Sequence, residues 1–396
     1  MFETIVFLGS FLLGLVFLLA LLFNAVGFFV KYFRQKDRTL VVKRLRKTAI
    51  LFSLSIILCV GFALFSQWHA STPQITDENG DIVAGSIAEL RQVELNGHKE
   101  WISIRGYDQT KPVLLFLAGG PGGSQMAAVR YDLSELEKYF VVVNWDQPGA
   151  GKSYGAVAKG DLTPETYIED GYALTKYLCA EFNQEKIYLI GESWGSALGI
   201  FMAASHPEYY HAFIGTGQMV DFVETERIDY AYAMEIASEA GDTDLVKKLE
   251  ENGEPPYYGN DITMKSAVYL NYLNGLMTAN PDIHHSGYNT MRDIAAAEYG
   301  ILDKINYLRG ILYTFNDVYQ QLYDIDLRED YAKLQIPVYF LEGRHDINAP
   351  TSLVKAYYDL LDAPTKEIVW FEHSGHSPWI NESDRFVKEI LRIAEK

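Results

Sequence analysis

Residues 188–196 constrain the fold more than any other part of the chain. An apolar run with β character, residues 186–190, meets the sequence Gly191-Glu-Ser-Trp-Gly195, and small helix-compatible residues follow as far as Ala204. This order predicts a strand, a sharp turn and a helix, with Ser193 at the apex of the turn. Glycines on both sides of the serine let the strand and the helix approach closely, as a nucleophile elbow requires.

The predicted turn places Ser193 at the N-terminus of the following helix. Unpaired backbone N–H groups and the helix dipole stabilise developing negative charge at that point. A helix N-cap is the structural alternative for this serine, but the surrounding motif favours a nucleophile. We therefore predict Ser193 as a catalytic nucleophile, with the backbone N–H of Trp194 as one donor of an oxyanion hole.

Two uncharged apolar runs precede the rest of the chain. Residues 5–30 make a run of 26, and residues 49–66 make a run of 18, against the ~20 that span a bilayer. The first run lacks a basic segment before it and exceeds the ~7–15 apolar residues of a signal peptide. The sequence therefore predicts a membrane hairpin over residues 1–70, with transmembrane helices at about 5–30 and 49–66.

The segment between these runs, residues 31–48, carries eight Lys or Arg residues against the single acid Asp37. Positively charged loops stay on the cytoplasmic side of a membrane, so this loop is predicted to be cytoplasmic and the chain after residue ~70 extracytoplasmic. The same basic residues also suit anionic lipid headgroups, and the two uses are compatible. The lipid bilayer is the first predicted partner.

The remainder reads as a polar linker, residues 71–85, followed by alternating strand and helix patterns. Strands are predicted at 87–95, 101–107, 112–117, 140–144, 186–190, 212–214, 337–341 and 366–371, and helices at 133–139, 164–182, 194–204, 352–361 and 383–395. A hairpin followed by such alternation predicts an α/β fold with a mostly parallel sheet. Its core is predicted to comprise residues 86–220 and 333–396.

Buried strand patterns stop between residues 221 and 332, where the pattern is helical, as in 224–240 and 264–279. This segment holds 21 acidic residues against 8 Lys or Arg. We predict an inserted helical cap over the C-terminal ends of the sheet, where open α/β sheets bind ligands. With a formal net charge of −18 for the whole chain, nucleic acid is not expected as a partner.

Three further signals follow other predicted strands. The loop Ala118-Gly-Gly-Pro-Gly-Gly-Ser124 exposes backbone N–H groups, so Gly120 is predicted as the second oxyanion donor. Asp346 and His376 follow the last two strands, which gives the order Ser, Asp, His of a catalytic triad at strand ends. His373 competes with His376, but it continues the strand, whereas His376 lies in a glycine-containing loop.

Together these motifs resemble the α/β-hydrolase fold, and within it the proline iminopeptidase group of serine aminopeptidases. That group carries His-Gly-Gly-Pro-Gly, Asp-Gln-Arg-Gly-x-Gly-x-Ser and Gly-Gly-Ser-Trp-Gly-Ser. This chain has Ala118-Gly-Gly-Pro-Gly122, Asp146-Gln-Pro-Gly-Ala-Gly-Lys-Ser153 and Gly191-Glu-Ser-Trp-Gly-Ser196. The resemblance covers about residues 86–393. Ala118, Pro148 and Glu192 depart from the group's pattern.

The resemblance implies an aminopeptidase that releases an N-terminal residue, often proline, from a peptide through an acyl-enzyme, with no metal and no cofactor. Such an enzyme holds a cationic α-amine, and a carboxylate in a partly desolvated cap is a physical means of doing so. Glu224 and Glu226, just after the sixth strand, are the predicted candidates. The alternatives are an esterase or lipase acting on uncharged acyl substrates, and a catalytically weak binding protein.

Overall fold

The structure, a computed structural model, describes residues 2–285 and 287–396. The chain divides into two compact units. The first comprises Met1–Ala70 with Tyr299–Lys304, and the second comprises Ser71–Glu298 with Ile305–Lys396.

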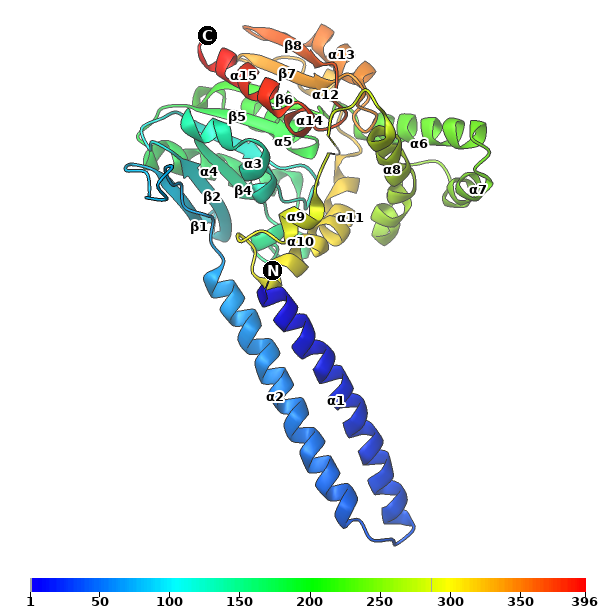
Figure 1. Cartoon of the computed structure of the whole chain (residues 1–396). Coiled ribbons are helices and arrows are strands. Elements are labelled where there is room, and N and C mark those ends of the chain that lie inside the picture. Colours follow the sequence, from blue (N-terminus) through cyan, green and yellow to red (C-terminus); the bar gives the residue numbers. More distant parts are fainter. Residues whose placement is uncertain (1, 286) are drawn as a thin grey trace. The chain divides into compact units, whose positions relative to one another are not determined.

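The first unit is a helical hairpin of α1 (Phe2–Phe33) and α2 (Thr39–His69), which lie side by side (Figure 1). Small residues line their contact: a Cβ atom at Gly14 would lie 3.1 Å from Ser55 Oγ, and Cys59 Sγ lies 3.4 Å from Ser10 Oγ. Both helices are long and apolar enough to cross a membrane. At the end of α2, Gln67 Nε2 donates to Asp303 Oδ1 at 3.0 Å.

The connection between these helices is shorter than the loop predicted for residues 31–48. Helix α1 continues to Phe33 and α2 begins at Thr39, so only residues 34–38 connect them and Lys43, Arg44, Arg46 and Lys47 lie on α2. Lys and Arg have high helix propensity. The charged residues therefore end the apolar runs, but both helices continue through them.

An eight-stranded sheet forms the centre of the second unit (Figure 1), in the order β1-β2-β4-β3-β5-β6-β7-β8. Its strands are β1 (Ile87–Leu95), β2 (His98–Gly106), β3 (Val113–Leu117), β4 (Val141–Asp146), β5 (Ile187–Glu192), β6 (Tyr210–Thr216), β7 (Val338–Gly343) and β8 (Lys366–Phe371). The pairs β1–β2 and β2–β4 are antiparallel and the other pairs are parallel. The predicted α/β fold with a mostly parallel sheet is confirmed.

Helices cover both faces of this sheet. Those outside the segment between β6 and β7 are α3 (Met126–Asp132), α4 (Pro164–Glu181), α5 (Trp194–Ser205), α13 (Thr351–Leu360), α14 (Pro378–Asn381) and α15 (Ser383–Ala394). Alternate residues of β3 enter different cores: Leu115 packs in the core that α4, α5 and α13 join, and Phe116 in the core that α3 and α15 join. A strand buried on both faces reads as a continuous apolar run, which is why β3 was recognisable.

The segment between β6 and β7 is helical and contains no strand among its described residues. Its helices are α6 (Phe222–Glu239), α7 (Thr243–Asn252), α8 (Ile262–Ala279), α9 (Thr290–Ile294), α10 (Ile301–Arg309), α11 (Phe315–Val318) and α12 (Leu327–Asp330). The predicted helices at 224–240 and 264–279 correspond to α6 and α8.

Two local predictions differ from the structure. The helix predicted at 133–139 is only a short 3₁₀ turn, Ser134–Lys138, and the true helix α3 comes before it. The first four residues of α3, Met126 to Val129, are all buried, so it has no amphipathic period to detect. Strand β2 begins at His98, three residues earlier than predicted, because the two-residue turn Asn96-Gly97 pairs Leu95 directly with His98.

Candidate active site

The carboxyl ends of four parallel strands bring the predicted site residues together. The glycine loop follows β3, Ser193 follows β5, Asp346 follows β7 and His376 follows β8. Parallel strands end at one edge of a sheet, so residues far apart in sequence meet there. Gly120, Ser193, Trp194, Glu226 and His376 line a single cavity.

Ser193 has the strained backbone expected at an elbow, with φ +54° and ψ −124°. Its flanking glycines have no room for a side chain. A Cβ atom at Gly191 would lie 2.1 Å from Gly195 O, and one at Gly195 would lie 2.2 Å from Leu117 O. The turn therefore requires both glycines, as the sequence predicted, and it places Ser193 at the N-terminus of helix α5.

His376 is held by Asp346. The Nδ1 atom of His376 lies 2.9 Å from Asp346 Oδ2, and Asp346 Oδ1 accepts the backbone N–H of Ala349 at 3.0 Å. Burial alone lowers the pKa of His376, but the charge and hydrogen bond of Asp346 outweigh it and raise the pKa. In the neutral ring, Nδ1 carries the proton that Asp346 accepts, and Nε2 is left as the acceptor.

His373, the competing histidine, lies elsewhere. Its ring is exposed, its Nδ1 atom lies 3.0 Å from the carbonyl oxygen of Asp282, and it stacks on His284 at 4.1 Å between ring centroids. The structure therefore brings His376, and not His373, to Asp346 and to the cavity that Ser193 lines.

The glycine loop and the elbow are tied together by Gln147. This side chain accepts the indole N–H of Trp194 at 2.9 Å and donates to Ala118 O at 3.0 Å. The N–H of Gly119 donates to Gln125 Oε1 at 3.3 Å, whereas Gly120 lines the cavity. Trp194 is the first residue of α5, and first-turn N–H groups have no partner within their helix.

Two cavities meet at Ser193 and His376. The larger has a volume of about 570 Å³ and its walls include the apolar side chains Met277, Ile283 and Ile311. The smaller has a volume of about 100 Å³, and its walls include the carboxylates Glu226 and Asp229 from α6.

Glu226 and Asp229 are buried and only partly satisfied. Glu226 Oε1 accepts the hydroxyl groups of Tyr269 at 3.0 Å and Ser266 at 3.2 Å. None of the described residues donates a hydrogen bond to Glu226 Oε2 or Asp229 Oδ1. Burial raises the pKa of Glu226 to about 7, and burial together with the charge of Asp346 raises the pKa of Asp229. A cationic ligand would satisfy both free oxygens.

Glu224, the other predicted amine ligand, points away from this cavity. Its carboxylate pairs with Arg328 at 2.6 Å, and Arg328 also contacts Asp221 and Asp326. Its side chain is 44% exposed and lines neither cavity. The prediction that Glu224 belongs to the substrate site is therefore not supported by its position.

Asp229 was missed from the sequence, although a signal for it exists. The buried face of α6 includes Phe222, Glu226, Asp229, Ala233 and Ala237, spaced by three or four residues. Two acids on the inward face of an amphipathic helix are unusual, because buried charges are rare unless they are paired or bind a ligand. Helical periodicity would have retained Glu226, added Asp229 and rejected Glu224.

Glu192, which differs from the motif of the proline iminopeptidase group, is buried, and both of its carboxylate oxygens accept hydrogen bonds. Its Oε1 atom accepts Ser377 Oγ at 2.6 Å and Trp379 Nε1 at 2.8 Å. Its Oε2 atom accepts Gln125 Nε2 and the hydroxyl of Tyr288. The carboxylate therefore ties the end of β5 to the loop after β8 and to the segment after β3.

Comparisons with known proteins concern the family and the fold. A family model described as the alpha/beta hydrolase fold matches residues 112–249. A probable aminopeptidase of Bacillus subtilis (strain 168), YbaC, is 30% identical over 311 residues, which are 78% of this chain and 97% of that protein. The proline iminopeptidase of Lactobacillus crispatus (strain ST1) is 23% identical, covering 75% of this chain and 94% of its own length.

Solved structures share the fold. The crystal structure of VinJ superposes with a TM-score of 0.56 at 21% identity, covering 77% of this chain and 98% of that one. At this level of identity the likeness concerns the arrangement of strands and helices only.

Proposed function

The chain belongs to the α/β-hydrolase family, with aminopeptidases and proline iminopeptidases among its relatives, and from this premise we propose that it is a serine aminopeptidase. It releases the N-terminal residue of a peptide through an acyl-enzyme. The observation that carries the proposal is the pair of partly unsatisfied carboxylates, Glu226 and Asp229, in the cavity that Ser193 and His376 line.

In the proposed reaction, Ser193 Oγ attacks the carbonyl carbon of the first residue. His376 Nε2 takes the serine proton and then gives it to the leaving amine, while Asp346 holds the ring and stabilises its charged form. The N–H groups of Gly120 and Trp194 stabilise the oxyanion. Water, activated by His376, then hydrolyses the acyl-enzyme.

The substrate α-amine would lie between Glu226 and Asp229. In a buried site an ammonium group is attracted by a carboxylate far more strongly than in water. The cavity of about 100 Å³ has room for only one small side chain or a proline ring. This limits cleavage to the first peptide bond, and the larger cavity of about 570 Å³ is then available for the rest of the peptide.

Hydrolysis of an uncharged ester is the second candidate, and the apolar wall of the larger cavity favours it. Met277, Ile283 and Ile311 would suit an acyl chain. The two candidates differ in whether the substrate needs a free amine, because an uncharged acyl chain makes no favourable interaction with two buried carboxylates.

The test compares two sets of substrates with one leaving group: prolyl and alanyl arylamides with a free amine, and the same compounds N-acetylated. The proposal predicts that acetylation removes most of kcat/KM at neutral pH. Equal or faster turnover of the acetylated compounds, or of simple fatty esters, would instead establish the esterase.

The nucleophile is tested separately. Ser193→Ala is expected to abolish both hydrolysis and covalent labelling by a fluorophosphonate probe. Full labelling of this variant would contradict the assignment of Ser193. If the unmodified enzyme is labelled but hydrolyses no ester or arylamide of a broad panel, the third alternative, a weak enzyme used as a binding protein, is supported instead.

We also propose that α1 and α2 anchor the enzyme in a membrane with its catalytic unit on the extracytoplasmic side. The basic residues around the connection at 34–38 support this orientation. Protease added to intact cells should then digest the chain after residue ~70, while cleavage near Lys43 should require lysis. Digestion of the catalytic unit only after lysis would reverse the orientation.

A further inference from the structure

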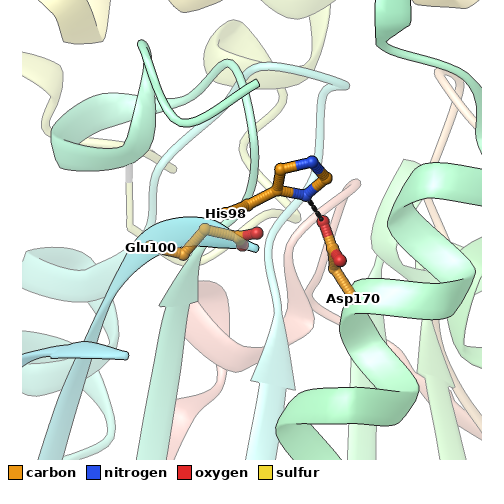
Figure 2. A group of neighbouring side chains, drawn as sticks. All are labelled: His98, Glu100 and Asp170. Carbon is orange, nitrogen blue, oxygen red and sulfur yellow. Dashed lines mark hydrogen bonds and ion pairs between the residues drawn. The ribbon is translucent and has the colours of Figure 1, made fainter. Parts of the chain in front are cut away.

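Three side chains with metal-binding groups gather where strand β2 meets helix α4 (Figure 2). His98 and Glu100 come from β2 and Asp170 from α4, and their ligand atoms lie within 4.8 Å of one another. Within residues 2–285 and 287–396, this is the only group of three or more His, Cys, Asp or Glu side chains so arranged. It lies outside both cavities of the candidate active site.

The two carboxylates are buried, and that of Glu100 is incompletely paired. Asp170 accepts hydrogen bonds from Asn96 Nδ2 and His98 Nδ1, each at 2.8 Å. Glu100 Oε2 accepts the indole N–H of Trp145 at 2.6 Å. Its other oxygen, Oε1, receives no hydrogen bond from any described residue, although Glu100 is completely buried. A buried carboxylate oxygen without a partner is energetically unfavourable, so the arrangement is complete only with a further positive group.

We propose that His98, Glu100 and Asp170 bind a divalent metal cation, Zn²⁺. One imidazole nitrogen and two carboxylates are the ligand types that this cation accepts. Donors at about 2.0–2.2 Å from one ion can be no more than about 4.4 Å apart. The observed spread of up to 4.8 Å therefore needs to contract by only a few tenths of an ångström.

The position of the cluster allows an ion to enter. The side chain of His98 is 32% exposed, whereas that of Asp170 is 1% exposed. The site thus opens to solvent on the imidazole side and is closed on the carboxylate side, which leaves room for water as a fourth ligand. An ion there would join the β1–β2 hairpin to α4, so its expected effect is on stability. The sequence alone implied no metal, and this proposal departs from that prediction.

A proton is the rival occupant. Burial, followed by the negative charge of Asp170, raises the pKa of Glu100 to about 10. Glu100 and Asp170 could then share a proton and need no metal, and the experiment has to separate these two states.

The experiment uses the full chain in detergent, without an affinity tag and after dialysis against a chelator. Zn²⁺ alone is titrated, and bound zinc is measured by equilibrium dialysis with elemental analysis, alongside the unfolding temperature. We expect one tightly bound zinc per chain and a higher unfolding temperature. His98→Ala and Glu100→Gln should each weaken binding by at least about 10–100-fold, since even the loss of an outer hydrogen-bond partner has that effect.

Two matched variants serve as controls. His206→Ala removes another histidine beside a carboxylate, 3.4 Å from Glu208 on the surface, and His376→Ala removes the imidazole of the candidate active site. Both should bind zinc as the unmodified chain does. His98 is partly exposed, so His98→Ala is expected to fold, as metal-free circular dichroism would verify, and it carries the test if Glu100→Gln does not fold.

The proposal is overturned if the unmodified chain binds no stoichiometric zinc, or if His98→Ala binds it equally well. A chain that binds no zinc but becomes more stable on Glu100→Gln substitution would identify the proton-sharing pair instead.

Discussion

Buried carboxylates at the candidate active site form two sets, which differ in how completely they are hydrogen-bonded. The first set is Glu192 alone, and the second is Glu226 with Asp229. Glu192 lines the larger cavity and accepts four side-chain donors, Gln125, Tyr288, Ser377 and Trp379. Glu226 and Asp229 line the smaller cavity, and no described residue donates to one oxygen of each. Burial alone therefore does not identify a ligand-binding acid, whereas an oxygen without a partner beside a cavity points to one.

The physical reason lies in what the rest of the protein supplies. Donors from three segments surround Glu192, so its charge is stabilised without a ligand and its bonds hold the elbow against its neighbours. Around Glu226 the described donors are two hydroxyl groups, on one oxygen only. The remaining stabilisation has to come from a ligand, and a cation is the simplest one.

The largest expected effect comes from removing the charges of the second set. In Glu226→Gln and Asp229→Asn, kcat/KM for a free-amine arylamide should fall by roughly 10²-fold or more, because losing one partner of a buried charge pair costs about 2–5 kcal/mol. Turnover of the N-acetylated arylamide should change little. Steady-state kinetics with both substrates measure the difference.

Glu224→Gln is the matched control for this prediction. It makes the same chemical change two residues away, at a carboxylate that is 44% exposed and paired with Arg328. Its kcat/KM should stay close to that of the unmodified enzyme. A loss in Glu224→Gln as large as in Glu226→Gln would mean that position relative to the cavity does not decide the function.

The same substitution at Glu192, the first set, should lower the free energy of unfolding. In Glu192→Gln one oxygen becomes an NH₂ group, which faces either Trp379 Nε1 or Gln125 Nε2, both donors. At least one buried donor loses its acceptor, so we expect a destabilisation of about 3 kcal/mol. Urea unfolding followed by tryptophan fluorescence measures it. Glu372→Gln, at an exposed glutamate paired with Arg344, is the control and should leave stability almost unchanged, because exposed ion pairs contribute little.

The first set also shows what the sequence could and could not predict. Strand ends are marked by apolar runs, and the candidate catalytic residues follow them in the loops, so Ser193, Asp346 and His376 could be named from local patterns. The partners of Glu192 come from three segments that lie far apart in the sequence, one with Gln125, one with Tyr288 and one with Ser377 and Trp379, and no local pattern links them. Long-range hydrogen bonding of this kind leaves no sequence period.

The helical segment at 221–332 was less predictable for a different reason. Its existence and the extent of α6 followed from periodicity. Which of its acids point inward depends on the position of each residue around the helix axis, where neighbours are rotated by about 100°. An assignment by proximity to β6 alone gave Glu224 equal weight with Glu226. The boundaries of α2 and the position of α3 were missed because neither element ends where its hydrophobic pattern changes.

A third prediction compares the two sets by how the free energy of unfolding changes when Glu226 or Glu192 is replaced by glutamine. Burial raises the pKa of Glu226 from its ordinary 4.5 to about 7, which means that ionised Glu226 opposes folding. Because the folded pKa is the higher one, this destabilisation is absent below about pH 4 and complete above pH 7. Glu226→Gln should therefore stabilise the protein by up to about 3 kcal/mol at pH 8, since one pKa unit corresponds to about 1.4 kcal/mol.

Unfolding at pH 4 and pH 8 measures this effect, and Glu192→Gln at the same two values is the comparison. The gain for Glu226→Gln should shrink toward zero at pH 4. If Glu226→Gln destabilises the protein at pH 8 as Glu192→Gln does, then Glu226 is also satisfied in the folded state, and the distinction between the two sets fails.

The smallest expected effect is the pH dependence of amine recognition. Binding of the ammonium group requires ionised Glu226, so the ratio of kcat/KM for free-amine and N-acetylated substrates should rise about tenfold from pH 6 to the plateau above pH 7. The ratio should fall again above about pH 8, where the substrate α-amine loses its proton. Titration of His376 affects both substrates and cancels in the ratio. In Glu226→Gln the part of the rise that Glu226 causes should disappear and only the part that Asp229 causes should remain, while the fall above pH 8 is unchanged. A ratio in the unmodified enzyme that stays constant from pH 6 to pH 7.5 would show that Glu226 is not the partner of the amine, whatever the enzyme hydrolyses.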